Sequence, residues 1–461
     1  MSKSELSLPP QVARTRAFID SPRMFKDPIE IFSKYTADFG DTFTFHFGGV
    51  KKAIVTSNPG IIQHVFKTNY HNYQKSEIQV RRMGHFLGSG LLTSHGRYWR
   101  TQRRLIQQGF HRAQLAALMQ IMQGVLDESI RRFEADIPKG PVDIYQQMMK
   151  FTFRIACRSL FSTKLKEEQL DFISNSISVI QEFICRQILQ PYLNPWFRIS
   201  GELRKFEQMR LRSDTIILNY IESRRQERQE YNDLLQILLD ARYEDTGEGM
   251  TDRQVLMESM QLLAAGHETS SNALSWVLYL LSKHPDALKR IRRELNTVLG
   301  DAPLQFSDLP KLEYTSQVLD ESMRIYPPFW MIDRFALEDD RILDIDIPKG
   351  TTVVAYIYGL HHSPEHWQDP ETFLPERFTK ENKEKHTPFS HLPFGGGPRV
   401  CIGSNYATMQ MLMILSALLR NFDFELVPNR KIEMHPMVIL RPEDGFEMYF
   451  SKRKRQSVAA F

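Results

Sequence analysis

The pattern of residues 250–285 constrains the fold of this chain more than any other part of the sequence. Apolar residues recur there three and four positions apart, and in the second half they occupy nearly all sides of a helix. Thr251 and Gln254 match a capping box at the start, and His284-Pro285 supplies a stop signal. A helix that is apolar all round is buried, so we expect this one to cross the interior of a large protein.

The flanking patterns place this helix in a mainly helical chain. Helical periodicity dominates from residue 59 to about residue 300, whereas residues 41–57 alternate like a β-hairpin. Strand-like segments return in residues 341–360 and near the end. We therefore expect a mainly α fold with a small β region, built as a single domain over residues 1–461. Its predicted parts are a β-rich lobe of about residues 40–60 and 330–360 plus the C-terminal strands, and a helical lobe of about residues 60–330 and 400–420.

Composition and charge narrow the class of protein. The 461 residues include 59 basic and 55 acidic ones, so the net charge of +4 says little about partners and we expect no nucleic-acid binding. The basic run at residues 452–455 is predicted to be a solvated tail, with a docking or nucleic-acid role as the alternative. Residues 1–18 lack an apolar core and no later apolar run could span a bilayer, so neither a signal peptide nor a membrane anchor is expected. Three cysteines are too few for a disulfide framework, which predicts a cytoplasmic protein.

One of the three cysteines differs from the others. Cys157 and Cys185 lie in apolar helical patterns, which are typical of inert buried thiols. Cys401 instead follows three glycines in "FGGGPRVCIG", residues 394–403. A phosphate loop would need Gly-Lys-Ser/Thr after its glycines, and a proline and an arginine stand there instead. A valine also occupies the place of the third glycine in the dinucleotide fingerprint, so phosphate binding is not expected.

Other chemistries of the Cys401 thiol can be compared. Structural zinc needs further cysteines or histidines close by, and the histidines of residues 361–366 lie in a loop-like stretch, where an exposed or core role is expected. A catalytic nucleophile would need a histidine base and leaves the glycines unexplained. A thiolate ligand of haem iron remains, because glycines would let the backbone pass close to the macrocycle and the helix predicted at residues 404–422 would favour the anion. Arg399 would then face a haem propionate.

The surroundings of this cysteine resemble the haem loop of the cytochrome P450 superfamily of haem-thiolate monooxygenases. The family pattern Phe-x-x-Gly-x-Arg-x-Cys-x-Gly is met by Phe394, Gly397, Arg399, Cys401 and Gly403. The resemblance implies haem b with the Cys401 thiolate as axial ligand, and places Phe394, Gly397 and Arg399 in the cofactor site. It also implies the family's triangular-prism fold, in which residues 250–285 form the long central distal helix.

Further motifs extend the resemblance over about residues 40–445. A Glu-x-x-Arg motif occurs at Glu321 and Arg324, and "PERF" at residues 375–378 supplies Arg377. In the family these three groups form a buried ion triad, which implies a structural and not a catalytic role. "GRYWRTQRRL", residues 96–105, resembles the family's Trp-x-x-x-Arg helix.

The resemblance also assigns side chains to the two faces of the haem. Trp99 and Arg103 lie one helical turn apart and would reach the propionates, as would Arg334 at the end of the strand that follows the Glu-x-x-Arg helix. "AGHETS" resembles the oxygen-binding groove, where the Thr269 hydroxyl would hold dioxygen and water and Glu268 would relay protons. Because side chains alternate along a strand, Trp330 and Ile332 would point to the same side as Arg334. The predicted substrate pocket consists of Leu92, Leu262, Ala265, Trp330 and Ile332.

The implied reaction inserts one oxygen atom of O2 into a C–H bond of a small or medium organic substrate. Hydroxylation and oxidative O-demethylation of a methyl ether, such as a methylated sugar, are both open, and a fatty acid, carotenoid or terpenoid is the alternative substrate. A peroxide-driven enzyme or a non-catalytic haem sensor would not need the acid and alcohol pair. We expect no fused reductase, so electrons are expected from a ferredoxin or flavodoxin and its NAD(P)H-dependent reductase, with Arg103, Arg104 and Arg112 as candidate docking residues.

Overall fold

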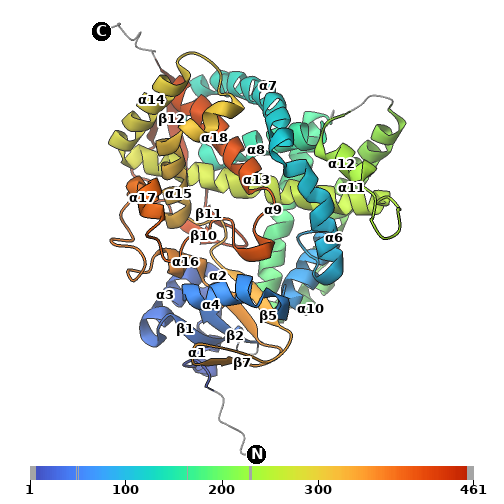
Figure 1. Ribbon diagram of the computed structural model, residues 1–461, viewed down its shortest axis with the longest axis vertical. Coiled ribbons are helices and arrows are strands. Elements are labelled where there is room, and N and C mark those ends of the chain that lie inside the picture. The colour runs from blue at the N-terminus through green and yellow to red at the C-terminus, as the bar shows by residue number, and fades with distance from the viewer. Residues whose placement is uncertain (1–6, 48, 50, 163–164, 228–230, 454–461) are drawn as a thin grey trace, which may run out of the picture.

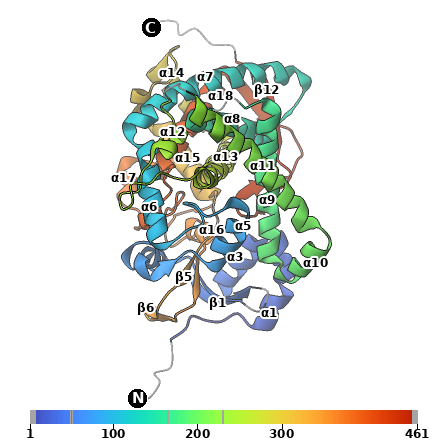
Figure 2. The same cartoon turned by 90° about the vertical axis from the view of Figure 1, so that its right-hand side faces the viewer.

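The computed structural model describes residues 7–47, 49, 51–162, 165–227 and 231–453. Its longest helix, α13 (Asp252–Lys283), runs across the middle of the molecule in Figure 1 and is seen nearly end-on in Figure 2. Thr251 and Gln254 form the predicted capping box, and His284 is the C-cap. The predicted central helix is therefore confirmed, because its start and stop are set by local side chains.

Other long helices surround α13 and bury its apolar faces. The helices that contact it directly include α8 (Ile144–Phe161), α9 (Glu167–Leu189), α11 (Glu202–Gln226), α15 (Glu313–Ile325) and α18 (Ser404–Asn421). The remaining helices of this part are α6 (Gly96–Gln107), α7 (Arg112–Asp136), α12 (Leu234–Asp240) and α14 (Pro285–Leu299).

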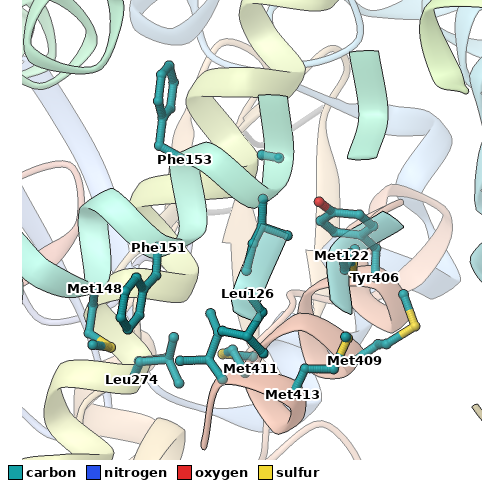
Figure 3. Packing of buried hydrophobic residues seen from close by; sticks show 14 of the residues in the cluster. Met122, Leu126, Met148, Phe151, Phe153, Leu274, Tyr406, Met409, Met411 and Met413 are labelled. Carbon is teal, nitrogen blue, oxygen red and sulfur yellow. The ribbon is translucent and has the colours of Figure 1, made fainter. Parts of the chain in front are cut away.

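Methionine is prominent in the core between these helices. Figure 3 shows Met122 of α7 and Met148 of α8 on the same cluster as Met411 and Met413 of α18 and Leu274 of α13. An unbranched thioether adapts to irregular gaps between helices. The core is thus continuous from α7 through α13 to α18.

A five-stranded sheet forms the second part of the molecule. Its order is β1 (Thr42–Phe47), β2 (Lys51–Thr56), β8 (Thr352–Ala355), β5 (Ile332–Ala336) and β3 (Tyr73–Gln74). The predicted hairpin is confirmed by the antiparallel pair β1 and β2, and the parallel pair β2 and β8 joins the two distant parts of the chain. Three helices that were not predicted from the sequence precede this sheet. They are α1 (Arg14–Ile19), α2 (Ser21–Lys26) and α3 (Pro28–Phe39).

The C-terminal strands do not join that sheet. β9 (Phe422–Leu426) and β12 (Glu447–Lys452) pair with each other and with β4 (Val142–Asp143). The rings of Phe422 and Phe450 pack edge-on against Phe133 of α7, at 5.3 and 5.0 Å. The prediction that placed all C-terminal strands in the β-rich lobe therefore fails for these two, because their aromatic faces complete the helical core.

Shorter elements complete the chain. Residues 357–361 form helix α16 (Ile357–His361), where a continuing strand was predicted. The others are α4 (Pro59–Gln63), α5 (Gly84–Leu87), α10 (Asn194–Ile199), α17 (Lys380–Lys383), β6 (Asp340–Ile342), β7 (Ile345–Ile347), β10 (Met434–Pro436) and β11 (Leu440–Pro442). Within the described residues, no helix combines the length and the apolar character that a membrane span requires. Of the predicted basic tail, Lys454 and Arg455 lie outside the described residues.

Candidate functional site

The loop before α18 is fixed by its own backbone and by a close neighbour. The amide of Cys401 donates to the carbonyl of Phe394 at 3.0 Å, which closes the loop, and Gly403 is the N-cap of α18. Gly397 has φ +67°, and a Cβ there would lie 1.9 Å from the carbonyl oxygen of Phe66. A glycine is thus required by contact with protein backbone, which differs from the predicted reason of clearance for a macrocycle.

The Cys401 side chain is exposed, whereas Cys157 and Cys185 are buried as predicted. Neighbouring protein atoms nevertheless enclose much of the thiol. This enclosure raises the pKa of Cys401, while the Gly403 amide and the Arg103 guanidinium act in the opposite direction. Both of the opposing groups would stabilise a thiolate.

One face of α13 also meets an open space. Ala265 is exposed, and Gly266 and Thr269 are partly exposed, although Ala264 is buried. An exposed alanine in the middle of the central helix requires an accessible cavity beside it. The Thr269 hydroxyl donates to the Ala265 carbonyl at 2.8 Å, a bond to the preceding turn that leaves the oxygen free to accept.

Glu268 is adjacent to Thr269 on α13 but is buried. Its side chain is 3% exposed, and Oε1 accepts a hydrogen bond from the Tyr145 hydroxyl of α8 at 3.3 Å. Oε2 has no hydrogen-bond partner among the described residues. Burial raises the pKa of Glu268 to about 7, against the opposite influence of Arg441 and Tyr145. A carboxyl group with this pKa can both give and take a proton at neutral pH.

Two arginines meet at the Trp99 ring beside the Cys401 loop. The Arg399 guanidinium lies 4.1 Å from the ring centre and donates to the Ser94 carbonyl at 3.1 Å. Arg103 lies 5.8 Å from the same ring and donates to the Val400 carbonyl at 2.9 Å. Trp99 itself is buried, so the predicted pair on α6 packs under the loop that carries Cys401.

Two further cations face the same region. Arg334 is buried over the Phe66 ring, and burial lowers its pKa to about 10. The pKa of Arg399 falls to about 9, first through burial and then through the charges of Arg334 and Arg103. Lys75 donates to the Leu92 carbonyl, and burial, Arg334 and Arg399 lower its pKa well below the usual range. Lys75 was not predicted as a site residue, because nothing in its local sequence pattern marks it.

This cluster of cations has the chemistry of an anion site. Arg103, Arg334, Arg399 and Lys75 form no salt bridge with a carboxylate among the residues that the structure describes. Asp333 offsets part of the charge, but its carboxylate is already engaged with Ser76 and Gln79. Buried cations are costly unless they are paired, so an external anionic group fits here. A haem, which carries one iron atom and two propionates, would fit a site that combines a thiol with these cations.

The Glu-x-x-Arg motif and Arg377 come together as a buried ion triad. Glu321 Oε2 lies 2.7 Å from Arg324 Nε, and Glu321 Oε1 lies 3.3 Å from Arg377 Nε. Arg324 also donates to the His361 carbonyl at 2.8 Å. The three charges join α15 to the segment at residues 375–378, which is a scaffolding arrangement.

The predicted pocket residues divide into two groups. Leu92 and Ile332 are partly exposed and Leu262 lies on α13 close to Ala265 in sequence. Trp330 is only 1% exposed: its indole N–H donates to the Met437 carbonyl at 2.8 Å and its ring packs on Phe32. It lies in the core beneath the five-stranded sheet and not in a pocket wall. Strand β5 begins at Ile332, so the alternation that predicted its direction does not extend to Trp330.

The three predicted docking arginines are not equivalent. Arg103 is turned inward to the Val400 carbonyl. Arg104 is exposed and pairs with Glu244, and Arg112 is exposed with its guanidinium 5.9 Å from the Phe306 ring centre. Only the last two present charge to the outer surface.

Comparisons with known proteins agree with this geometry. The family profile named Cytochrome P450 matches residues 18–450. The cyclooctat-9-en-7-ol 5-monooxygenase of Streptomyces melanosporofaciens is 31% identical over 381 residues, covering 82% of each chain. The pentalenene oxygenase of Streptomyces avermitilis is 28% identical, covering 95% of this chain and 94% of its own. The structure of retinoic acid-bound cyanobacterial CYP120A1 matches with a TM-score of 0.84 and 27% identity, over 97% of this chain and 100% of that one.

Proposed function

The chain belongs to the cytochrome P450 family of haem monooxygenases that hydroxylate organic substrates, and on this premise we propose that Cys401 is its axial haem ligand and an apolar terpenoid its substrate. The family uses haem with a cysteine thiolate as axial ligand. Cys401 is supported in that role because its thiol is exposed beside a cluster of cations that form no salt bridge among the described residues. This combination of thiol and cations is the observation that carries the proposal.

The residues around the cofactor would divide its binding between them. Cys401 would hold the iron, while Arg103, Arg334, Arg399 and Lys75 would receive the two propionates and so lose their mutual repulsion. When bound, the haem supplies the activation of dioxygen and the transfer of one oxygen atom to a C–H bond. The protein would exclude bulk water and orient the substrate.

Proton transfer would fall to the two polar residues of α13. The Thr269 hydroxyl would accept a hydrogen bond from water in the cavity while its own O–H continues to donate to the Ala265 carbonyl. Glu268, with a pKa of about 7, would supply protons from its carboxyl oxygen. A peroxide-driven enzyme or a haem sensor would not need this pair, so turnover with a redox chain is expected and turnover only with peroxide is not.

The substrate proposal rests on apolar side chains and on the names of relatives. Leu92, Leu262, Ala265 and Ile332 would line the pocket, and none of them can donate a hydrogen bond from its side chain. Two relatives are named for the oxidation of cyclooctat-9-en-7-ol and pentalenene, and a solved neighbour binds retinoic acid. Each of these molecules is mostly hydrocarbon. The alternative of O-demethylating a methylated sugar has no comparable support and stays a prediction, tested by formaldehyde release.

Electrons would come from a separate protein of the ferredoxin or flavodoxin type, with its NAD(P)H-dependent reductase. Arg112 and the exposed arginines of α6 would form part of the docking face. Reduction of the haem should slow as ionic strength rises, because contacts between exposed charges are screened by salt.

The central experiment measures ligation and substrate binding separately. Cys401→Ala should abolish the strongly red-shifted Soret band of the reduced carbon monoxide complex, whereas Cys157→Ala, a buried cysteine, should leave it in place. Wild-type protein is then titrated with terpenoids, retinoic acid, fatty acids and methylated sugars. We expect a spin-state shift and a singly oxygenated product with a terpenoid. Retention of the band in Cys401→Ala would exclude the ligand assignment, and a response confined to sugars would exclude the substrate class.

A further inference from the structure

A cavity lies beside Tyr145, the residue whose hydroxyl donates to Glu268. It has a volume of about 360 Å³ and lies between α8 and α9, next to the hairpin that carries Arg441. Its walls combine apolar side chains with polar and charged ones, and the latter include Gln146, Lys150, Asp171, Asn175, Glu182 and Arg441. A single water needs only about 10–15 Å³ of such space, so this cavity can hold many waters.

Two buried polar atoms at this cavity lack partners among the described residues. They are the Ser178 hydroxyl of α9 and Nε of Arg441. Buried polar groups are nearly always hydrogen-bonded, and water is the usual partner when protein supplies none. The unpaired atoms and the charged walls therefore point to a hydrated cavity.

Tyr145 separates this cavity from Glu268. The tyrosine lines the cavity and its hydroxyl donates to Glu268 Oε1 at 3.3 Å. Arg441 faces the same pair from β11, and its charge favours ionisation of both Tyr145 and Glu268. Glu182 of α9 holds the guanidinium with a contact of 3.2 Å. The charged groups that face Glu268 are thus arranged at the cavity and not at the Thr269 side.

Burial raises the pKa of the Tyr145 hydroxyl further above its ordinary value, so the phenol stays neutral. A neutral hydroxyl can give one proton while it accepts another. Glu268 needs such a donor after each proton that it releases, because its own side chain is only 3% exposed.

We propose that the cavity between α8 and α9 is the proton entrance of the enzyme, that Tyr145 passes protons from its water to Glu268, and that Arg441 is the positioning residue for this pair. The inference rests on the proposed function of Glu268. In each transfer the Tyr145 O–H proton moves to Glu268 Oε1, a cavity water gives a proton to the phenol oxygen, and a proton from bulk solvent restores that water. One proton moves inward, no electron is exchanged, and Tyr145 ends as it began.

The first test observes Glu268 in the resting protein, without turnover. The C=O stretching band of its protonated carboxyl is assigned by the difference between wild type and Glu268→Gln. In Tyr145→Phe the band should move to higher frequency, because its donor is lost. The pH midpoint should rise by about one unit, since the donor favours the carboxylate. Tyr220→Phe, which removes a hydroxyl bonded to the Phe161 carbonyl, serves as the matched control and should change neither.

The second test measures how much of the electron supply reaches product. Tyr145→Phe should lower this coupling about tenfold and enlarge the solvent deuterium isotope effect, while the carbon monoxide band and the substrate-induced spin shift stay as in wild type. Arg441→Gln should raise the pH midpoint of the Glu268 band, because a favourable charge is removed, and Arg441→Lys should restore it.

The outcomes separate this inference from the proposed function. An unchanged Glu268 band and unchanged coupling in Tyr145→Phe, in a protein that still hydroxylates, would overturn the proton entrance and leave the function intact. A wild-type protein with no haem-thiolate band would overturn the function, whereas the infrared titration would still report whether Tyr145 and Arg441 act on Glu268.

Discussion

Two buried carboxylates on neighbouring helices differ in how completely their oxygens are hydrogen-bonded. Glu321 of α15 accepts two hydrogen bonds from Arg324, at 2.7 and 2.9 Å, one from Arg377 and one from the Leu374 amide. Glu268 of α13 has one long bond from Tyr145 and an oxygen without a partner among the described residues. A fully satisfied charge fixes structure, whereas a half-satisfied one keeps the capacity to change its protonation. The difference separates scaffold from chemistry within one protein.

Removing the partner of Glu321 should have the largest effect. Arg324→Ala leaves a carboxylate buried with two of its four hydrogen bonds lost, which costs about 3–5 kcal/mol of unfolding free energy. We expect a poorly folded protein that does not retain haem, measured by urea unfolding and by the haem content after purification. A stable Arg324→Ala protein would show that the hydrogen bonds of Glu321 are no more important for the fold than those of Glu268.

Acid should weaken the Glu321 region next. Nδ1 of His361 contacts the Arg324 carbonyl at 3.2 Å, and its Nε2 accepts from the Leu392 amide at 2.9 Å, so this buried histidine must be neutral. Burial, followed by neighbouring histidines and Arg324, lowers the pKa of His361 well below 6.5. The unfolded chain then binds more protons, so stability falls as the pH drops below 6.5.

The loss should be about 1.4 kcal/mol per pH unit for each such histidine. Burial also lowers the pKa of His391 to about 3, so its contribution is lost between about pH 6.5 and 3. Glu268 has the opposite sign: its folded pKa of about 7 exceeds the ordinary 4.5, so its stabilising contribution declines as pH rises through that window. Urea unfolding from pH 4 to 8 measures how the unfolding free energy changes on the acidic and on the neutral side. In His361→Gln the unfolding free energy should fall less steeply as the pH decreases.

Neutralising Glu268 should affect the reaction and not the fold. In Glu268→Gln the side chain keeps nearly the same shape but can no longer give or take a proton. We therefore expect product formation to fall about 100-fold. The unfolding free energy should change by less than about 1 kcal/mol. Rapid kinetics with quantified product, together with urea unfolding, separate the two effects. Equal loss of stability in Glu268→Gln and Arg324→Ala would remove the distinction between the two sites.

Local sequence was sufficient for some of these residues and not for others. The ends of α13 are set by Thr251, Gln254 and His284, all within the segment itself, so the central helix was predictable. Cys401 could also be selected as the candidate ligand from the sequence, because a compact pattern of glycine and arginine surrounds it.

The remaining site residues depend on contacts between distant segments. Tyr145 and Arg441 reach Glu268 only when α8 and β11 pack against α13, and Lys75 joins the cations from a segment with no recognisable pattern. Trp330 was misplaced because the start of β5 decides its direction, and alternation cannot locate a strand end. Pairing and burial of this kind are set by tertiary packing, so no local rule recovers them.

The smallest expected effect concerns a satisfied polar residue on the same helix as Glu268. Gln261 is buried and holds the loop at residues 87–93: Nε2 donates to the Leu87 and Gly88 carbonyls at 3.1 and 3.0 Å, and Oε1 accepts from the Leu92 amide at 2.7 Å. Like Glu321 it positions backbone, but without a charge.

Gln261→Ala should therefore cost about 1–2 kcal/mol, less than the loss of a buried ion pair, and the loss should be local. We expect faster amide hydrogen exchange at Leu92 and weaker substrate binding, because the loop that would carry a pocket residue is released from α13. Gln254→Ala, which removes the capping partner of Thr251, is the control on the same helix and should leave exchange at Leu92 unchanged. Unchanged exchange at Leu92 in Gln261→Ala would show that the Gln261 hydrogen bonds do not hold this loop. Satisfied hydrogen bonds would then not position backbone at Gln261 as they do at Glu321.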